Sequence, residues 1–193
     1  MSEPSFRILG LAASLRRSSL HRGLLRAARE VSPEDVAYDG FDLGRVPFFN
    51  ADVEAEGDPE PVAELKERIR TADAVLIASP EYDYAVPGVL TTTLDWALRP
   101  PSPRRYKPVG IVGTSPGGAG TARGQMVLRQ MLLHAPAYVM PEPQMLIGNA
   151  RRRFDEAGNL TDEETRERLR RFIAALREWT YRMRRPVESR ERC

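Results

Sequence analysis

The sequence contains a single cysteine, Cys193, which is the last of its 193 residues. An intrachain disulfide is therefore excluded, and so is a metal cluster built from thiolates. No stretch approaches the roughly 18 apolar residues that a transmembrane helix requires. The N-terminus reaches Arg16 and Arg17 too early for a secretory signal peptide. From these absences we expect a cytoplasmic protein with no membrane partner and no metal site.

Neither sign of charge dominates, because the chain has 29 basic and 27 acidic residues and a formal net charge of +2. Arginines crowd between Arg151 and Arg192, but glutamates interleave with them along a helical pattern. A solvated helix face accounts for this pattern better than a nucleic-acid-binding patch does, so we expect no nucleic-acid partner. The length suits one domain, which we place at residues 1–183, followed by a frayed arginine-rich tail at 184–193.

Short apolar runs alternate with segments of helical periodicity over most of the chain. The apolar runs predict strands at residues 7–12, 36–41, 74–78 and 109–112, and an interrupted last strand at 137–140 and 144–147. The periodic segments predict helices at residues 19–31, 62–69, 87–97, 120–134 and 162–183. We expect Thr161 to cap the last helix. This alternation is typical of a doubly wound parallel sheet, whose ligands bind at the carboxyl ends of the strands.

The loop after the first strand, residues 13–21, has hydroxyls and guanidiniums but no glycine. It leads into a helix, where free backbone N–H groups and the helix dipole favour an anion. Dinucleotide-binding folds place glycines here so that the backbone can approach a pyrophosphate. Ser14, Arg16 and Ser19 suit one terminal phosphate monoester instead. A loop that only caps the helix would have a similar composition, and this alternative stays open.

The loops after the third and fourth strands are rich in residues that suit a flat ligand. Residues 79–88 contain two tyrosines between Pro80 and Pro87, which make a stiff amphipathic rim for a planar heteroaromatic ring. Residues 113–123 contain four glycines, which let the backbone approach a ligand closely. An ordinary surface loop and a flexible turn are the alternatives. The convergence of all three loops at one end of the sheet favours a ligand site.

Two motifs resemble those of the NADPH-dependent FMN reductase family, which includes bacterial quinone, chromate and azo-dye reductases. The first family motif reads close to G-S-L-R-x-x-S-x-N, and here Ala13 replaces its glycine and His21 replaces its asparagine. The second resembles P-E-Y-N-x-x-x-P-G-x-L-K-N-x-x-D-W, and this chain has Pro80-Glu81-Tyr82-Asp83, Pro87-Gly88, Leu90 and Asp95-Trp96 at the matching places, with Asp83 where the motif has its first asparagine. The resemblance covers roughly residues 7–176, which is most of the chain.

This resemblance implies a flavodoxin-like α/β fold, a three-layer sandwich with a five-stranded parallel sheet in the order 2-1-3-4-5. It also implies bound FMN, which passes hydride from NADPH or NADH to a small oxidant such as a quinone, a free flavin, an azo compound or a metal oxyanion. We expect no general base, because the flavin carries the hydride chemistry. The residues implied to bind the cofactor are Ser14, Arg16, Ser19, Leu20, His21, Pro80, Glu81, Tyr82, Asp83, Ser115, Pro116, Gly117 and Gly118.

The resemblance further implies a homodimer or homotetramer, with the helix that carries Trp96 as a candidate interface and packing of that helix in the core as the alternative. We expect His21 on the surface of its helix, near the phosphate. The carboxylate of Asp83 is expected to lower the midpoint potential of the flavin, because it disfavours the negative charge of the reduced ring. Two other functions stay open: an electron carrier of the flavodoxin type, and a non-enzymatic module that binds FMN or another phosphate ligand.

Overall fold

A parallel sheet forms the centre of the computed structural model, which describes residues 5–99, 107–135 and 137–184. The strands follow the order β2-β1-β3-β4-β5, and β6 also pairs with β4. Their bounds are β1 Phe6–Ala12, β2 Val36–Phe41, β3 Ala74–Ala78, β4 Pro108–Thr114, β5 Tyr138–Val139 and β6 Met145–Ile147. The predicted order is confirmed. The interrupted last strand is confirmed too, because β5 pairs with the beginning of β4 and β6 with its end.

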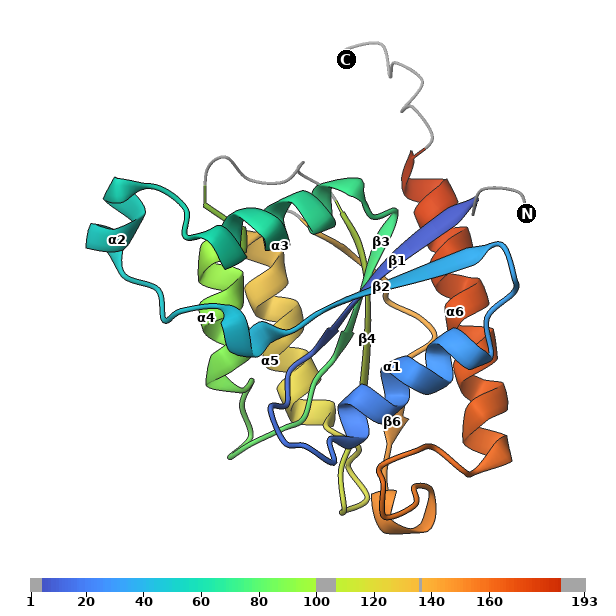
Figure 1. The fold of residues 1–193 in the computed structure, drawn as a ribbon. Helices are drawn as coiled ribbons and strands as arrows, with labels where there is room; N and C mark the ends of the chain where they lie inside the picture. Colours follow the sequence, from blue (N-terminus) through green and yellow to red (C-terminus); the bar gives the residue numbers. More distant parts are fainter. Residues whose placement is uncertain (1–4, 100–106, 136, 185–193) are drawn as a thin grey trace, which may run out of the picture.

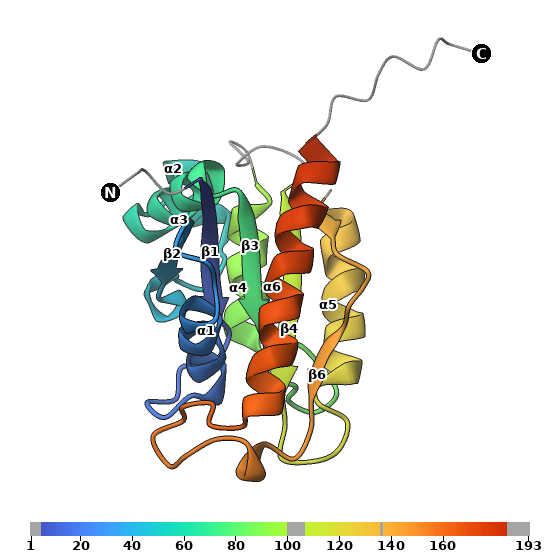
Figure 2. The same ribbon diagram turned by 90° about the vertical axis from the view of Figure 1, so that its right-hand side faces the viewer.

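Helices cover both faces of the sheet and complete three layers (Figure 1). One face is covered by α1 (Leu20–Glu30) and α6 (Glu163–Arg184), and the other by α3 (Glu60–Thr71), α4 (Gly88–Ala97) and α5 (Ala122–His134). In the view turned by 90°, α1 and α6 lie in front of the sheet and α4 lies behind it (Figure 2). The chain therefore has the flavodoxin-like architecture that its sequence predicts.

Each buried strand supplies side chains to both hydrophobic cores. Ile8 and Leu76 are buried beneath α1 and α6, whereas their neighbours Leu9 and Ile77 are buried beneath α3, α4 and α5. Because helices cover both faces, the strand at residues 74–78 is buried along its whole length. This double burial explains why the inner strands are continuous apolar runs and not alternating ones.

Two local features differ from the prediction. A short helix, α2 (Ala51–Glu56), was not predicted, because none of its residues is buried and it therefore has no apolar periodicity. It begins where the Asn50 side chain accepts a hydrogen bond from Asp52 N at 2.9 Å. The prediction that Thr161 caps the last helix is wrong: the carboxylate of Asp162 accepts from Thr165 N at 2.9 Å, and so occupies the cap position next to α6.

The side chain of Trp96 lies in the hydrophobic core. It is 0% exposed, and its Nε1 donates a hydrogen bond to the carbonyl of Pro47 at 3.0 Å. The edge of one ring meets the face of the other between Phe49 and Trp96, with centroids 5.0 Å apart. The side chain of Trp96 therefore holds the segment before α2 against α4, and the role of its helix as an interface stays a prediction.

The predicted division between domain and tail falls at the end of α6. This helix continues through Arg184, which forms an ion pair with Asp73, the residue directly before β3. Residues 185–193, including Cys193, lie outside the described residues. The boundary at residues 183 and 184 stays a prediction.

Candidate functional site

The loops that follow β1, β3 and β4 lie together at the carboxyl edge of the sheet, the lower end in Figure 1. These loops, together with the first two residues of α1, contain all the residues predicted to bind the cofactor. Of these, Ser14, Ser19, His21 and Pro80 are buried, Leu20, Glu81 and Ser115 are partly exposed, and Arg16, Tyr82, Asp83, Pro116, Gly117 and Gly118 are exposed. Because neighbouring parallel strands end side by side, the three loops frame one site.

The first loop presents hydroxyls to the N-terminus of α1. The hydroxyl of Ser19 caps this helix by accepting from Arg22 N at 3.3 Å, and the first turn contains no acidic residue. Ser14 is buried as well, while Arg16, with its guanidinium group, is exposed. Ala13, which replaces the family's glycine, packs its methyl group into the core. A carboxylate-free helix N-terminus with hydroxyls around it is suited to a phosphate group.

His21 lies inside the protein and not on the helix surface, so that prediction is wrong. Its side chain is 6% exposed, and its Nε2 accepts a long hydrogen bond from Thr114 N at 3.4 Å. Burial lowers the pKa of His21 to about 4, although a backbone hydrogen bond with Ser79 opposes that shift. The imidazole ring is therefore neutral at pH 7. The prediction failed because the apolar periodicity of α1 did not show that the polar residue His21 also faces the sheet.

The second loop makes a tight reversal that exposes two tyrosines. Backbone hydrogen bonds join Tyr82 and Ala85 in both directions, at 3.2 and 2.9 Å. The two residues between them, Asp83 and Tyr84, have φ of 49° and 67°. Positive φ at both central residues is the pattern of a type I′ turn, in which glycine or asparagine is usual and a tyrosine is strained. The turn leaves the side chains of Tyr82 and Tyr84 exposed at the edge of the site.

Glu81 fixes this loop to the beginning of α5. Its carboxylate accepts from Gly124 N at 2.9 Å and from Arg123 Nε at 2.8 Å, and its side chain is only 8% exposed. Burial opposes ionisation, yet these hydrogen bonds hold the pKa of Glu81 below its ordinary value. The guanidinium of Arg123 also lies 3.8 Å from the centroid of the Tyr84 ring. The side chain of Glu81 therefore positions the loop, and only its backbone is left to line a ligand.

The third loop leaves open space beside its glycines. A Cβ atom added to Gly117 or Gly118 would meet nothing within 4 Å. The hydroxyl of Ser115 accepts from Gly120 N at 3.1 Å and donates to the carbonyl of Gly117 at 3.2 Å, which shapes the loop from within. The backbone here can thus approach a flat ligand closely.

A segment that the sequence did not single out supports two of these loops. Asn149 N donates to the carbonyl of Gly117 at 3.0 Å, and Ala150 N donates to the carbonyl of Ser115 at 3.1 Å. Further along, Gly158 contacts α1 so closely that a Cβ on Gly23 would lie 1.8 Å from the Gly158 carbonyl oxygen. The segment has no helical or strand periodicity, and only turn-forming Gly-Asn pairs mark it in the sequence.

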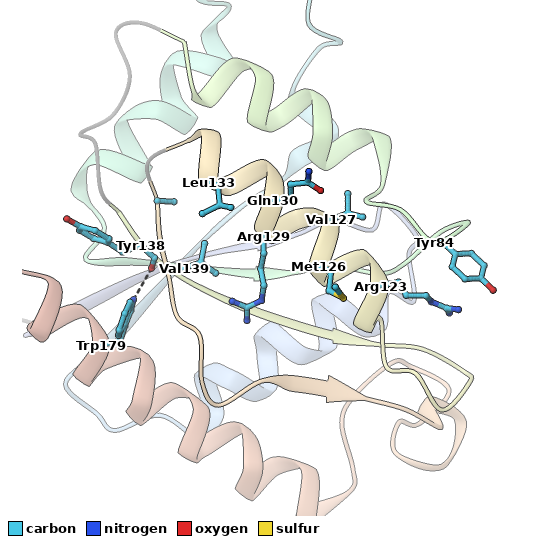
Figure 3. A pocket seen from close by; sticks show the side chains of 11 residues that line it. Tyr84, Arg123, Met126, Val127, Arg129, Gln130, Leu133, Tyr138, Val139 and Trp179 are labelled. Carbon is cyan, nitrogen blue, oxygen red and sulfur yellow. Dashed lines mark hydrogen bonds between the residues drawn. The ribbon is translucent and has the colours of Figure 1, made fainter.

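A groove of about 840 Å³ runs along the exposed face of α5 (Figure 3). Met126 and Leu133 are 70% and 79% exposed on this face. Tyr84 and Arg123 lie at the N-terminal end of the helix, next to the ring-side loop. The groove is lined by Tyr84, Arg123, Met126, Val127, Arg129, Gln130, Leu133, Ala137, Tyr138, Val139 and Trp179.

The described residues include no candidate metal site. No group of three or more histidine, cysteine, aspartate or glutamate side chains among residues 5–99, 107–135 and 137–184 is arranged to hold a metal ion. Over the same residues, no helix combines the length and the apolar character needed to cross a membrane.

Residues 6–152 match the NADPH-dependent FMN reductase family. The chain belongs to this family. It is 39% identical over 179 residues to an NAD(P)H-dependent FMN reductase of Pseudomonas aeruginosa, with 92% of this chain and 97% of that protein covered. It is 37% identical over 187 residues to an NADPH:quinone oxidoreductase of Arabidopsis thaliana, with 94% and 95% covered.

The family assignment agrees with a solved structure of high similarity. FerB, a flavoenzyme NAD(P)H:(acceptor) oxidoreductase from Paracoccus denitrificans, superposes with a TM-score of 0.84 at 32% identity. The superposition covers 92% of this chain and 98% of that one. The recognition of the family and of the fold from the two sequence motifs is therefore confirmed.

The residues at the sheet edge fit FMN. A single phosphate monoester suits the hydroxyls of Ser14 and Ser19 at the N-terminus of α1, where no carboxylate opposes it. A flat ring suits the open space beside Gly117 and Gly118, which side chains would otherwise fill. The site therefore offers FMN, the cofactor in the family's name, one end without carboxylates for its phosphate and one end with open space for its ring.

Proposed function

We propose that this chain is an FMN-dependent NAD(P)H oxidoreductase that reduces quinones and related small oxidants. The observation that carries the proposal is the meeting, at one sheet edge, of a carboxylate-free helix N-terminus and an open loop pair rimmed by Tyr82 and Tyr84. The quinone class of acceptor comes from the curated relative with 37% identity over nearly its full length.

Each end of the site has its own task in this proposal. Ser14, Ser19 and Arg16 bind the phosphate, and the backbone of residues 80–83 and 115–118 flanks the ring. FMN, when bound, supplies the hydride chemistry, so the protein contributes orientation, exclusion of water and charge. Tyr82, which is 48% exposed, leaves room for a nicotinamide and afterwards for an acceptor on the same side. Such an open edge suits acceptors of several shapes.

A second copy of the chain completes this open edge by covering the α5 groove. Exposed apolar patches of this kind mark interaction surfaces, and a two-fold contact buries the same face of both copies. The groove reaches Tyr84 and Arg123, so a partner seated on it would border the ring-side loop directly. Leu133→Glu is expected to yield a monomer in light scattering, whereas Phe48→Glu, an equally exposed apolar position outside the groove, should leave the oligomer intact.

The activity is tested by adding NADPH anaerobically to the FMN-saturated protein and following the visible absorbance of the oxidised flavin. We expect rapid loss of this absorbance, and its return when a benzoquinone is added. Binding of FMN without bleaching would favour an electron carrier that reacts with protein partners. Failure to bind FMN would contradict the assignment of the three loops.

A further inference from the structure

The hydrogen-bonded pairing of β3 with β4 ends at the carboxyl edge of the sheet. Ala78 pairs with Val112, and the last regular bond of this ladder runs from Ser79 N to the carbonyl of Val112 at 3.0 Å. In a regular parallel ladder the next bond would join Thr114 N to the carbonyl of Ser79. Thr114 N instead donates to His21 Nε2 at 3.4 Å. The imidazole thus stands where the next rung of the ladder would be.

A neutral imidazole is chemically suited to this place. It offers one acceptor nitrogen and one donor nitrogen, so a single ring can serve the backbone of both strands. Its acceptor meets Thr114 N on β4, and the ring also hydrogen-bonds with the backbone of Ser79 after β3. The side chain is 6% exposed, so a Thr114 N–H left without this partner would be buried and unsatisfied.

The position of His21 in the chain connects this bridge to the phosphate end of the site. His21 is the second residue of α1, directly after the turn that Ser19 caps. Ser79 is the first residue after β3, and Thr114 is the last residue of β4, directly before the glycine loop. One side chain therefore contacts the chain at the point where each ring-flanking loop begins, from the helix whose N-terminus faces the phosphate.

We propose that His21 is a positioning residue that sets the separation between the two loops flanking the flavin ring and couples that separation to the phosphate-binding turn. The inference rests on the proposed function for its ligand, FMN, but the bridge itself is a feature of the protein. His21 stands where the family motif has an asparagine.

The test compares His21→Gln with His21→Leu in the FMN-saturated protein. Glutamine retains an acceptor at a reach similar to that of Nε2, whereas leucine fills the space without one. We expect the leucine variant to bind FMN at least about tenfold more weakly, the size of one lost buried hydrogen bond. We also expect a lower kcat for it, with little change in the KM for NADPH. The glutamine variant should stay within about threefold of the wild type in each quantity.

The rate of amide hydrogen exchange at Thr114 distinguishes the proposed hydrogen bond from a general packing role of His21, because loss of packing alone would not change exchange at this one amide selectively. Exchange at this one amide should accelerate in the leucine variant and remain slow in the glutamine variant. Equal FMN affinities in the wild type and the leucine variant would overturn the proposal. So would an equal loss in both variants with unchanged Thr114 exchange.

The wild-type protein allows a test that does not depend on the folding of any variant. Long-range proton–nitrogen spectra of His21 should show a neutral ring with its proton on Nδ1 and its Nε2 free to accept. A proton on Nε2 would overturn the proposal. If the wild type does not bind FMN, the proposed function fails, while these nitrogen shifts and the Thr114 exchange still decide whether the bridge exists.

Discussion

Ser14 and Ser19 at the phosphate end of the site are each 3% exposed, whereas Tyr82 and Tyr84 at the ring end are 48% and 66% exposed. The phosphate end is enclosed by the buried first turn of α1 and by the segment around Gly158. At the ring end, a strained turn is held to the start of α5 by Glu81, through its ion pair with Arg123 and its hydrogen bond from Gly124 N. A charged phosphate needs fixed donors, while a ring that must meet two successive substrates needs an accessible side.

The largest expected effect is a loss of stability on acidification that arises at the enclosed end. The pKa of His21 is lowered to about 4 in the folded protein, against about 6.5 when unfolded. Between these values the unfolded chain binds a proton that the native chain does not, so stability falls as the pH drops through this window, by roughly 3 kcal/mol in all. Denaturant unfolding of the wild type and of His21→Gln at pH 7, 5.5 and 4.5 measures the difference. Parallel pH profiles for the two proteins would contradict it.

A methyl group at Gly23 should destabilise the enclosed end by a steric clash. The added Cβ would lie 1.8 Å from the carbonyl oxygen of Gly158, and backbone cannot yield as a flexible side chain does. Gly23→Ala is expected to destabilise the fold by about 2 kcal/mol, in thermal or denaturant unfolding.

Gly117→Ala at the open end is the matched control for that substitution. Its Cβ meets nothing within 4 Å, so stability should change by less than about 0.5 kcal/mol while FMN affinity falls. If Gly117→Ala destabilises the protein as much as Gly23→Ala does, the contrast between the two ends is wrong.

Removal of the helix cap should separate stability from phosphate binding. Ser19→Ala removes the hydroxyl that accepts from Arg22 N, at a cost of about 1 kcal/mol. Ser14 is in the same loop, but the residue that caps α1 is Ser19. Ser14→Ala should therefore weaken FMN binding with a smaller loss of stability. Calorimetric unfolding and FMN titration of both variants provide the comparison, and equal stability losses would count against it.

The smallest effect is expected at the open end. Asp83 is exposed, so solvent screens its carboxylate and its influence on the reduced flavin is below about 1 kcal/mol. Asp83→Asn should raise the FMN midpoint potential slightly, because it removes a negative charge near the ring. Spectroelectrochemical titration measures the shift, and an unchanged or lowered potential would show that Asp83 does not face the ring.

Much of the architecture could be predicted because it depends on burial. The apolar run at residues 74–78 and the spacing of Leu24, Ala27 and Ala28 in α1 follow from which faces leave water. The exposed α2 could not be predicted in this way, because a helix that buries nothing has no apolar pattern. The segment at residues 148–158 escaped prediction for another reason: it contacts the glycine loop and α1 through backbone atoms, and the side chains that it buries, Ala150 and Phe154, follow no helical or strand period.

The sequence by itself determined the family, the strand order and the three loops that meet at the carboxyl edge of the sheet, since these depend on local motifs and on periodic burial. Only the tertiary structure decided what individual polar side chains do within that frame. Glu81 turns toward α5, Trp96 enters the core, and His21 bridges two strands that lie far from it in the chain. A buried polar group is satisfied by whichever partner the folded chain brings within reach, and distances along the chain do not reveal that partner.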